Sequence, residues 1–317
     1  MNTTVKIAKR LDFQIYFKKI FFLISSSSIL VSITSSMLLL LSFILHGIRA
    51  NLSLLIAAFA LTFAIYNFDR TIKQKEDLIN DPERTRLFAG NRKIWTIVGT
   101  FFFIASMALA LREGLNIFLT MFSIIAVYTG YGIGFPLIPR LKDIPGVKNL
   151  VLVSSWTIVP TILPNLSEYG AVEKKGILLS IMIFYFIFIK IMVNSILYDV
   201  RDIKGDSATG VRTLPVVMGV KNVRMILLIF NSTLILWIIE CWRLNIFLPF
   251  LPILTANIFY GFWYINFFTE NINNKRTLLD ILVDGEWIPL TLLIALINIL
   301  SWGLKNIPII SRLFFVC

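Results

Sequence analysis

Long apolar stretches, separated by short charged segments, dominate the chain. Nine of them reach about 20 residues, the length of helix that crosses a bilayer. They cover residues 20–46, 51–68, 94–111, 115–134, 149–166, 177–198, 222–242, 246–268 and 284–304. The pattern predicts an all-α, polytopic membrane protein with about nine transmembrane helices, forming a single transmembrane domain over residues 1–317.

Composition and charge agree with this class. Hydrophobic residues make up 57% of the 317 and charged residues 15%, against about 45–50% and about 25% in soluble domains. The net charge of +12 points to cytoplasmic loops and anionic lipid head groups, and we expect a lipid bilayer and no nucleic acid as partner. With His46 as the single histidine, a His-rich metal site and a Ser–His–Asp triad are excluded, and two cysteines give no disulfide framework.

The loop charges predict how the chain lies in the cell membrane. With the N-terminus in the cytoplasm, 22 Lys and Arg residues fall on the cytoplasmic side and 7 on the other, and Lys190, inside a span, completes the total of 30. This asymmetry follows the positive-inside rule. We therefore expect the N-terminus and the charged loops 66–93 and 198–221 to be cytoplasmic.

A row of carboxylates lies where the sixth apolar stretch ends. The segment from Tyr198 to Gly219 reads YDVRDIKGDSATGVRTLPVVMG and carries Asp199, Asp202 and Asp206. Their offsets of i, i+3 and i+7 place them on one face of a helix. Three such carboxylates repel one another unless cations lie among them, and Mg²⁺ is often held by one or two carboxylates together with substrate phosphates. The alternative is a solvated, charged helix end.

A second acidic segment, YNFDRTIKQKEDLINDPERTRLFAGNRK, follows the second apolar stretch at residues 66–93. Asp69 and Glu76 are seven residues apart and share a helical face, with Asp77 one position further on. Asp81, followed by proline, is typical of the N-cap of a short helix. A solvated loop would explain most of this segment, but it explains Asp69 at the membrane boundary poorly.

The loop after the fourth apolar stretch is cationic and rich in Gly and Pro. It reads YTGYGIGFPLIPRLKDIPGVKN over residues 128–149 and carries Tyr131, Lys142 and Lys148. The dense Gly and Pro residues predict an irregular, turning segment. Taken alone, its charge is explained by the positive-inside rule, and Tyr131 by the preference of tyrosine for membrane interfaces.

Together, the three segments resemble the UbiA superfamily of intramembrane prenyltransferases. DVRDIKGD and the TLPVVMG run that follows are similar to the second aspartate motif of the family, DxxDxxxD. Tyr131 and Lys142 resemble residues of the family's loop after helix four. The first motif departs from the family's NxxxDxxxD, because with Asp69 as its central aspartate, Ile65 stands at the Asn position and Lys73 at the following Asp position.

The resemblance implies helices around a central cavity, and a reaction in which Mg²⁺ assists ionisation of a prenyl diphosphate to an allylic carbocation. The prenyl group then passes to an aromatic or other lipophilic acceptor. The resemblance also implies roles for individual residues. The expected catalytic residues are Asp69, Lys142, Asp199, Asp202 and Asp206. The expected metal ligands are Asp69, Glu76, Asp77, Asp199, Asp202 and Asp206. The expected diphosphate contacts are Arg70, Lys73, Tyr131, Lys142, Arg201, Lys204 and Arg212.

The sequence leaves two other functions open. A charge inside a span, Lys190, suits a transporter or channel, with Asn194 as its expected local partner. However, no paired spans broken by Gly or Pro mark a midplane substrate site. Acidic residues gathered at one end of the spans fit an enzyme that acts on a charged head group better than they fit a transport pathway. The irregular first motif is the argument for the other function, a superfamily member with altered or lost activity.

Overall fold

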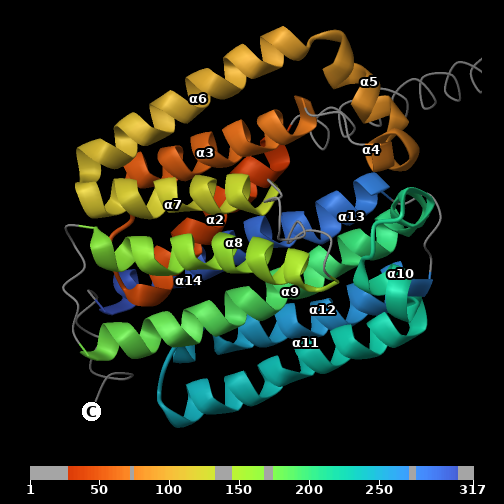
Figure 1. Ribbon diagram of the computed structural model, residues 1–317. Coiled ribbons are helices and arrows are strands. Elements are labelled where there is room, and N and C mark those ends of the chain that lie inside the picture. The colour runs from red at the N-terminus through yellow and green to blue at the C-terminus, as the bar shows by residue number, and fades with distance from the viewer. Residues whose placement is uncertain (1–27, 72–74, 133–144, 168–173, 271–275, 306–317) are drawn as a thin grey trace, which may run out of the picture.

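The computed structural model describes residues 28–71, 75–132, 145–167, 174–270 and 276–305, and their regular secondary structure is helical with no strand among them (Figure 1). Each apolar stretch expected from the sequence coincides with a long helix of this described part. These helices are α2 (Ile29–His46), α3 (Leu52–Thr71), α6 (Arg92–Glu113), α7 (Leu115–Gly132), α8 (Val147–Leu166), α9 (Lys174–Thr209), α11 (Val220–Arg243), α12 (Leu251–Glu270) and α14 (Trp287–Lys305).

The membrane class is confirmed by the length and apolarity of these helices. Within the described residues, seven of them are long and apolar enough to cross a membrane. Large apolar side chains such as Phe101 on α6 and Trp242 on α11 lie on the outer surface, 67% and 70% exposed, as expected of side chains that face lipid. The all-α, polytopic class therefore holds, while the count of nine spans stays a prediction.

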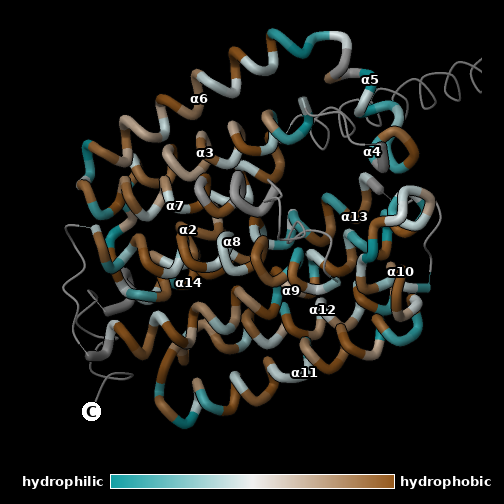
Figure 2. The backbone as a smooth tube through the Cα atoms, in the orientation of Figure 1, coloured by the Kyte–Doolittle hydropathy of each residue, from teal (hydrophilic) through white to brown (hydrophobic). Residues whose placement is uncertain are grey.

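Short helices gather at one end of the bundle. They are α4 (Lys75–Asn80), α5 (Pro82–Gly90), α10 (Leu214–Met218) and α13 (Arg276–Leu282). Figure 2 shows hydrophilic residues concentrated around them, whereas the long helices are mainly hydrophobic along their middles. Two 3-10 turns, η2 (Leu248–Phe250) and η3 (Asp284–Glu286), precede α12 and α14. The polar end of the molecule is thus built from the segments that carry the acidic motifs.

Helix α9 carries the second acidic motif to this polar end. It is 36 residues long, roughly 54 Å at 1.5 Å per residue, and so exceeds the hydrocarbon core of about 30 Å. The sequence predicted a span ending near residue 198, and the helix continues without a break to Thr209. It ends at Gly210, whose φ of 79° is left-handed, and Val211 N–H donates to the Asp206 carbonyl at 2.9 Å, the glycine-ended cap common at helix C-termini.

Buried apolar side chains form cores on both sides of α2 and α9. One core lies among α2, α3, α6, α7 and α8, and includes Phe43, Leu54 and Met121. The other surrounds α9 and brings it against α2, α11, α12 and α14, with Phe186 and Trp237 stacked at a centroid distance of 5.0 Å. Because α9 is packed over most of its length, the acidic motif extends from a rigid element.

Lys190, in the middle of α9, pairs with Glu286 rather than with Asn194, the partner expected from helical spacing. Nζ of Lys190 lies 2.8 Å from Oε2 of Glu286, and both side chains are at most 1% exposed. Asn194 Nδ2 and the Tyr264 hydroxyl donate to the other carboxylate oxygen of Glu286, at 3.5 and 3.4 Å. A buried charge needs a partner, and this one comes from η3.

Candidate active site

The three motif aspartates lie on the last turns of α9, as predicted. Asp199 and Asp206 are buried, 3% and 5% exposed, and the side chain of Asp202 is 23% exposed. The helix therefore turns its acidic face toward neighbouring segments of the protein, which argues against the alternative of a solvated helix end.

Asp199 is held by two residues at the start of α8. Lys148 Nζ lies 3.0 Å from its Oδ1, and Asn149 Nδ2 donates to its Oδ2 at 2.9 Å. Asn149 Nδ2 also donates to Ser195 Oγ, one turn earlier on α9, at 2.9 Å. Lys148 and Asn149 were not expected as site residues. The positive-inside rule already explained the charge of Lys148, and nothing in the sequence indicated a partner for either residue on α9.

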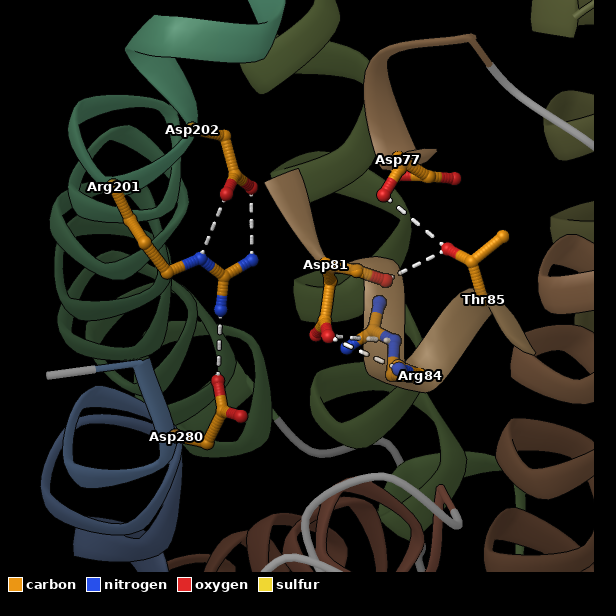
Figure 3. A network of polar contacts seen from close by, with 7 residues as sticks. All are labelled: Asp77, Asp81, Arg84, Thr85, Arg201, Asp202 and Asp280. Atoms are coloured by element: carbon orange, nitrogen blue, oxygen red, sulfur yellow. Dashed lines mark hydrogen bonds and ion pairs between the residues drawn. The ribbon is translucent and has the colours of Figure 1, made fainter. Parts of the chain in front are cut away.

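Asp202 is held by its neighbour Arg201 (Figure 3). Nε and Nη2 of Arg201 donate to the two carboxylate oxygens of Asp202 at 3.0 and 2.8 Å, and Nη1 donates to Asp280 on α13 at 2.9 Å. The guanidinium also lies 4.5 Å from the centre of the Tyr198 ring. Asp280 is a third site residue that sequence reasoning missed, since its segment resembles no motif.

The first acidic segment docks on α9 through α4. The N–H of Gly205 donates to Oδ1 of Asn80 at 2.9 Å, and a Cβ at residue 205 would overlap the Asn80 carboxamide. A larger residue at this position would force the Asn80 side chain to move and to give up this hydrogen bond. The contact sets α4, and with it Asp77, against the acidic end of α9, so the two acidic segments meet.

Asp81 caps α5, as expected. Its Oδ1 accepts a hydrogen bond from the backbone N–H of Arg84 at 3.2 Å (Figure 3), and Pro82 occupies the first turn. Its Oδ2 lies 3.7 Å from Nε of Arg84. The role of Asp81 is thus to fix the start of α5, and it needs no catalytic explanation.

Asp69 and Arg70 lie in the last turn of α3, both partly buried. The Arg70 guanidinium lies over the rings of Tyr66 and Phe88, with centroid distances of 6.0 and 5.4 Å. Because Phe88 belongs to α5, this stacking joins the end of α3 to the second short helix of the segment. Cation–π contacts of this kind stabilise by about 0.5–1 kcal/mol where exposed and more where desolvated.

The remaining expected residues divide into three groups. Lys204 on α9 and Arg212 just before α10 are exposed at the polar end. Lys73 and Lys142 fall outside the described residues. The backbone places Glu76 in α4 and Tyr131 in the last turn of α7, but their side chains lie outside the described part of the chain. The roles expected for these residues stay predictions.

The donor set fits a hard cation, although the described side chains form no ready-made cage. Among the described residues, no three His, Cys, Asp or Glu side chains converge into a metal site. Lys148, Asn149 and Arg201 instead bind the oxygens of Asp199 and Asp202. Oδ2 of Asp206 and the side-chain oxygens of Asn67 and Asn149 are buried acceptors with no hydrogen-bond partner in the described structure. Carboxylate and amide oxygens of this kind are the ligands that Mg²⁺ favours.

Known proteins resemble both the sequence and the fold. The model of the UbiA prenyltransferase family matches residues 29–279. Digeranylgeranylglyceryl phosphate synthase from Pyrococcus furiosus is 28% identical over 144 residues, 45% of this chain and 48% of the relative. The protein of the same name from Thermococcus sibiricus is 30% identical over 118 residues, 37% of this chain and 40% of the relative. These matches cover less than half the length of either relative.

The solved structures that are similar extend over most of the chain. A UbiA homologue from Archaeoglobus fulgidus superposes with a TM-score of 0.62 at 16% identity, covering 88% of this chain and 98% of that one. A structure of a UbiA homologue from the same organism bound to DMAPP and Mg²⁺ gives a TM-score of 0.59 at 15% identity, covering 88% and 99%. The fold and the family match confirm the resemblance drawn from the sequence: the chain belongs to the UbiA prenyltransferase family.

Proposed function

We propose that this protein is an integral-membrane prenyltransferase that moves a prenyl group from a prenyl diphosphate to a lipophilic acceptor. The observation that carries the proposal is the acidic end of α9, where Asp199, Asp202 and Asp206 meet the cations Lys148 and Arg201 at the polar end of an apolar bundle. A prenyl diphosphate has the matching character, with a polyanionic head and a long apolar tail. The Mg²⁺ and DMAPP in the related structure support the same assignment.

Mg²⁺ is the proposed cofactor, and when bound it neutralises charge on the diphosphate. Its proposed ligands come from both acidic segments: Asp69, Glu76, Asp77, Asp199, Asp202 and Asp206. Oδ2 of Asp206 is buried and has no hydrogen-bond partner among the described residues, so a cation bound there would displace no hydrogen bond that they make. Asp199 and Asp202 would share their oxygens between the cation and the residues that now hold them.

Cationic side chains stabilise the departing diphosphate in this proposal. Lys148 is suited to the role, because its side chain is 36% exposed while Asp199 beneath it is 4% exposed, so its ammonium can turn from the carboxylate toward a phosphate oxygen. Arg70, Lys73, Lys142, Arg201, Lys204 and Arg212 are the further proposed contacts, with Tyr131. Fixed positive charges placed where negative charge develops are usually the largest single contribution to catalysis.

The reaction breaks the bond between the allylic carbon and the diphosphate oxygen, whose electrons leave with the diphosphate. The allylic cation that remains is stabilised by aromatic faces. Tyr66 lies one turn before Asp69, and its ring centre is 5.8 Å from that of Trp156 on α8. We propose this pair as the aromatic surface next to the first acidic segment. The acceptor then attacks the cation and loses its proton.

The nature of the acceptor is part of the proposal. The family resemblance favours an electron-rich aromatic ring or an alcohol, and the name of the Pyrococcus furiosus relative adds glyceryl phosphate lipids as a class to test. The transporter alternative loses its argument, because Lys190 is neutralised by Glu286 inside a packed core. The proposed orientation has the N-terminus and the acidic segments in the cytoplasm, where soluble prenyl diphosphates would meet them.

Purified protein, reconstituted in lipid nanodiscs, tests the function. Incubation with Mg²⁺, prenyl diphosphates of several chain lengths and the acceptor classes above should yield prenylated acceptor and free diphosphate, detected by mass spectrometry and by phosphate release. Binding of prenyl diphosphate without any product across acceptor classes and chain lengths would favour the member with lost activity.

A further inference from the structure

Asp280 adds a carboxylate to the acidic end of α9 from a different helix. Its Oδ1 accepts a hydrogen bond from Nη1 of Arg201 at 2.9 Å, and the two side chains are 16% and 15% exposed. Asp280 lies on α13, and Figure 3 shows it on the opposite side of the guanidinium from Asp202. One arginine thus connects the second acidic motif to the segment that precedes α14.

Arg201 is fixed from three directions. Its Nε and Nη2 bind both oxygens of Asp202, its Nη1 binds Asp280, and its plane lies over the Tyr198 ring. Arginine presents its donors in a rigid fork, so two carboxylates on different edges determine both its position and its orientation. Without Asp280, Nη1 of Arg201 would lose this hydrogen bond. The guanidinium and the Asp202 carboxylate bound to it could then rotate together.

The charges of the trio give Asp280 a second effect. Arg201 and Asp202 alone form a neutral pair, which has little attraction for a cation. With Asp280 on the other edge, the trio of Asp202, Arg201 and Asp280 keeps one net negative charge. The positive charge of Arg201 is then shared between two carboxylates, so the Asp202 carboxylate is less fully neutralised and attracts a divalent ion more strongly.

We propose that Asp280 is a positioning residue of the active site, which anchors and partly neutralises Arg201 so that Asp202 keeps the orientation and charge needed to bind Mg²⁺. This proposal rests on the proposed function for two points, the identity of the metal and the reaction that the metal serves. Asp280 acts through Arg201 and is not itself proposed to touch metal or substrate.

The test is an Asp280→Asn variant, which keeps the shape of the side chain and removes its charge. Binding of Mn²⁺, a spectroscopic substitute for Mg²⁺, is measured by electron paramagnetic resonance on the nanodisc protein, beside the Mg²⁺ concentration that gives half-maximal turnover. Both should shift to weaker affinity by about 10- to 100-fold, the usual effect of losing a partner that orients a metal ligand. Asp280→Glu, which keeps the charge, should recover most of the affinity.

A matched control comes from another Arg–carboxylate pair. Arg224 Nη1 lies 2.8 Å from Oε1 of Glu270, which ends α12. Glu270→Gln removes the same kind of contact away from the acidic motif and should leave Mn²⁺ affinity unchanged. Thermal unfolding of each variant shows whether a lower affinity reflects loss of fold, since a purely structural role would lower the melting temperature without a selective effect on the metal.

A double-variant comparison shows whether Asp280 acts through Arg201. In an Arg201→Gln background, Asp280→Asn should change Mn²⁺ affinity less than about twofold, because residues that share one interaction have non-additive effects. An undiminished effect in that background, or Mn²⁺ affinity equal to wild type in the single variant, would overturn the proposal. Absence of prenyl transfer by the wild-type protein would instead count against the proposed function, and the Mn²⁺ measurements would still decide the role of Asp280.

Discussion

Nζ of Lys148 lies 3.0 Å from Oδ1 of Asp199, and this ion pair joins the start of α8 to the acidic end of α9. The pair places a cation beside a buried carboxylate, and in the proposed function a diphosphate would meet the motif at this position. It also connects the Gly- and Pro-rich segment 128–149 to the second acidic motif. The family resemblance implies that these two segments act together, but the sequence alone does not show that they are in contact.

Lys148→Gln should therefore lower turnover strongly. Losing one preorganised charge that faces the developing anion costs about 100- to 1,000-fold in kcat, and the KM for prenyl diphosphate should rise as well. Steady-state kinetics in nanodiscs measures both. Lys221→Gln, at an exposed lysine in the first turn of α11, is the matched control and should behave as wild type. Equal kinetics for the two variants would remove Lys148 from the site.

Gly205→Ala should displace the Asn80 side chain and loosen the packing of α4 on α9. Its new methyl group would overlap the Asn80 carboxamide, and forced overpacking of this kind costs about 1–3 kcal/mol in the free energy of unfolding. The variant should lose both thermal stability and activity, because Asp77 moves with α4. The double variant Gly205→Ala/Asn80→Ala removes the overlap and should recover part of the stability. Ser207→Ala, at an exposed position two residues later on α9, should cost less than about 0.5 kcal/mol.

The Lys190–Glu286 pair predicts an asymmetry between single and double variants. Lys190→Met leaves the Glu286 carboxylate buried without its cation, which costs about 3–5 kcal/mol. Lys190→Met/Glu286→Leu removes both charges and should recover most of the loss, since well-packed apolar residues can replace a buried pair. Thermal unfolding in detergent measures both. A single variant as stable as wild type would show that the pair is not a structural contact of this kind.

Helices and local signals could be predicted from the sequence, because they depend on neighbouring residues. Apolar length located the long helices, the i, i+3 and i+7 offsets located the acidic face of α9, and Asp81 was identified as a cap. The pairs that complete the site could not be predicted. Lys148 with Asp199, Arg201 with Asp280 and Lys190 with Glu286 join different helices, and their meeting depends on how the bundle packs. Helical spacing assigned Lys190 to Asn194 because it considers one helix at a time.

The topology makes a prediction about accessibility. In a variant without Cys241 and Cys317, a single cysteine at Glu83 on α5 or at Ser207 on α9 should react with a membrane-impermeant maleimide only from the cytoplasmic side. Both positions are exposed. A cysteine at Arg112, exposed at the far end of α6 from α5, should react only from the opposite side. Labelling of Glu83 and Ser207 from different sides would contradict the proposed orientation.

The most direct test of the account is the metal dependence of prenyl transfer by wild-type protein and by Asp202→Ala. Wild-type protein should convert prenyl diphosphate and acceptor to product with Mg²⁺, should stop when EDTA removes the metal, and should resume when Mg²⁺ is restored. Asp202→Ala should keep its fold, because the side chain is partly exposed at the polar end, and should turn over at least about 100-fold more slowly at any Mg²⁺ concentration. Wild-type turnover by Asp202→Ala at ordinary Mg²⁺ concentrations, or undiminished product formation in EDTA, would contradict the assignment of α9 as the metal-binding element.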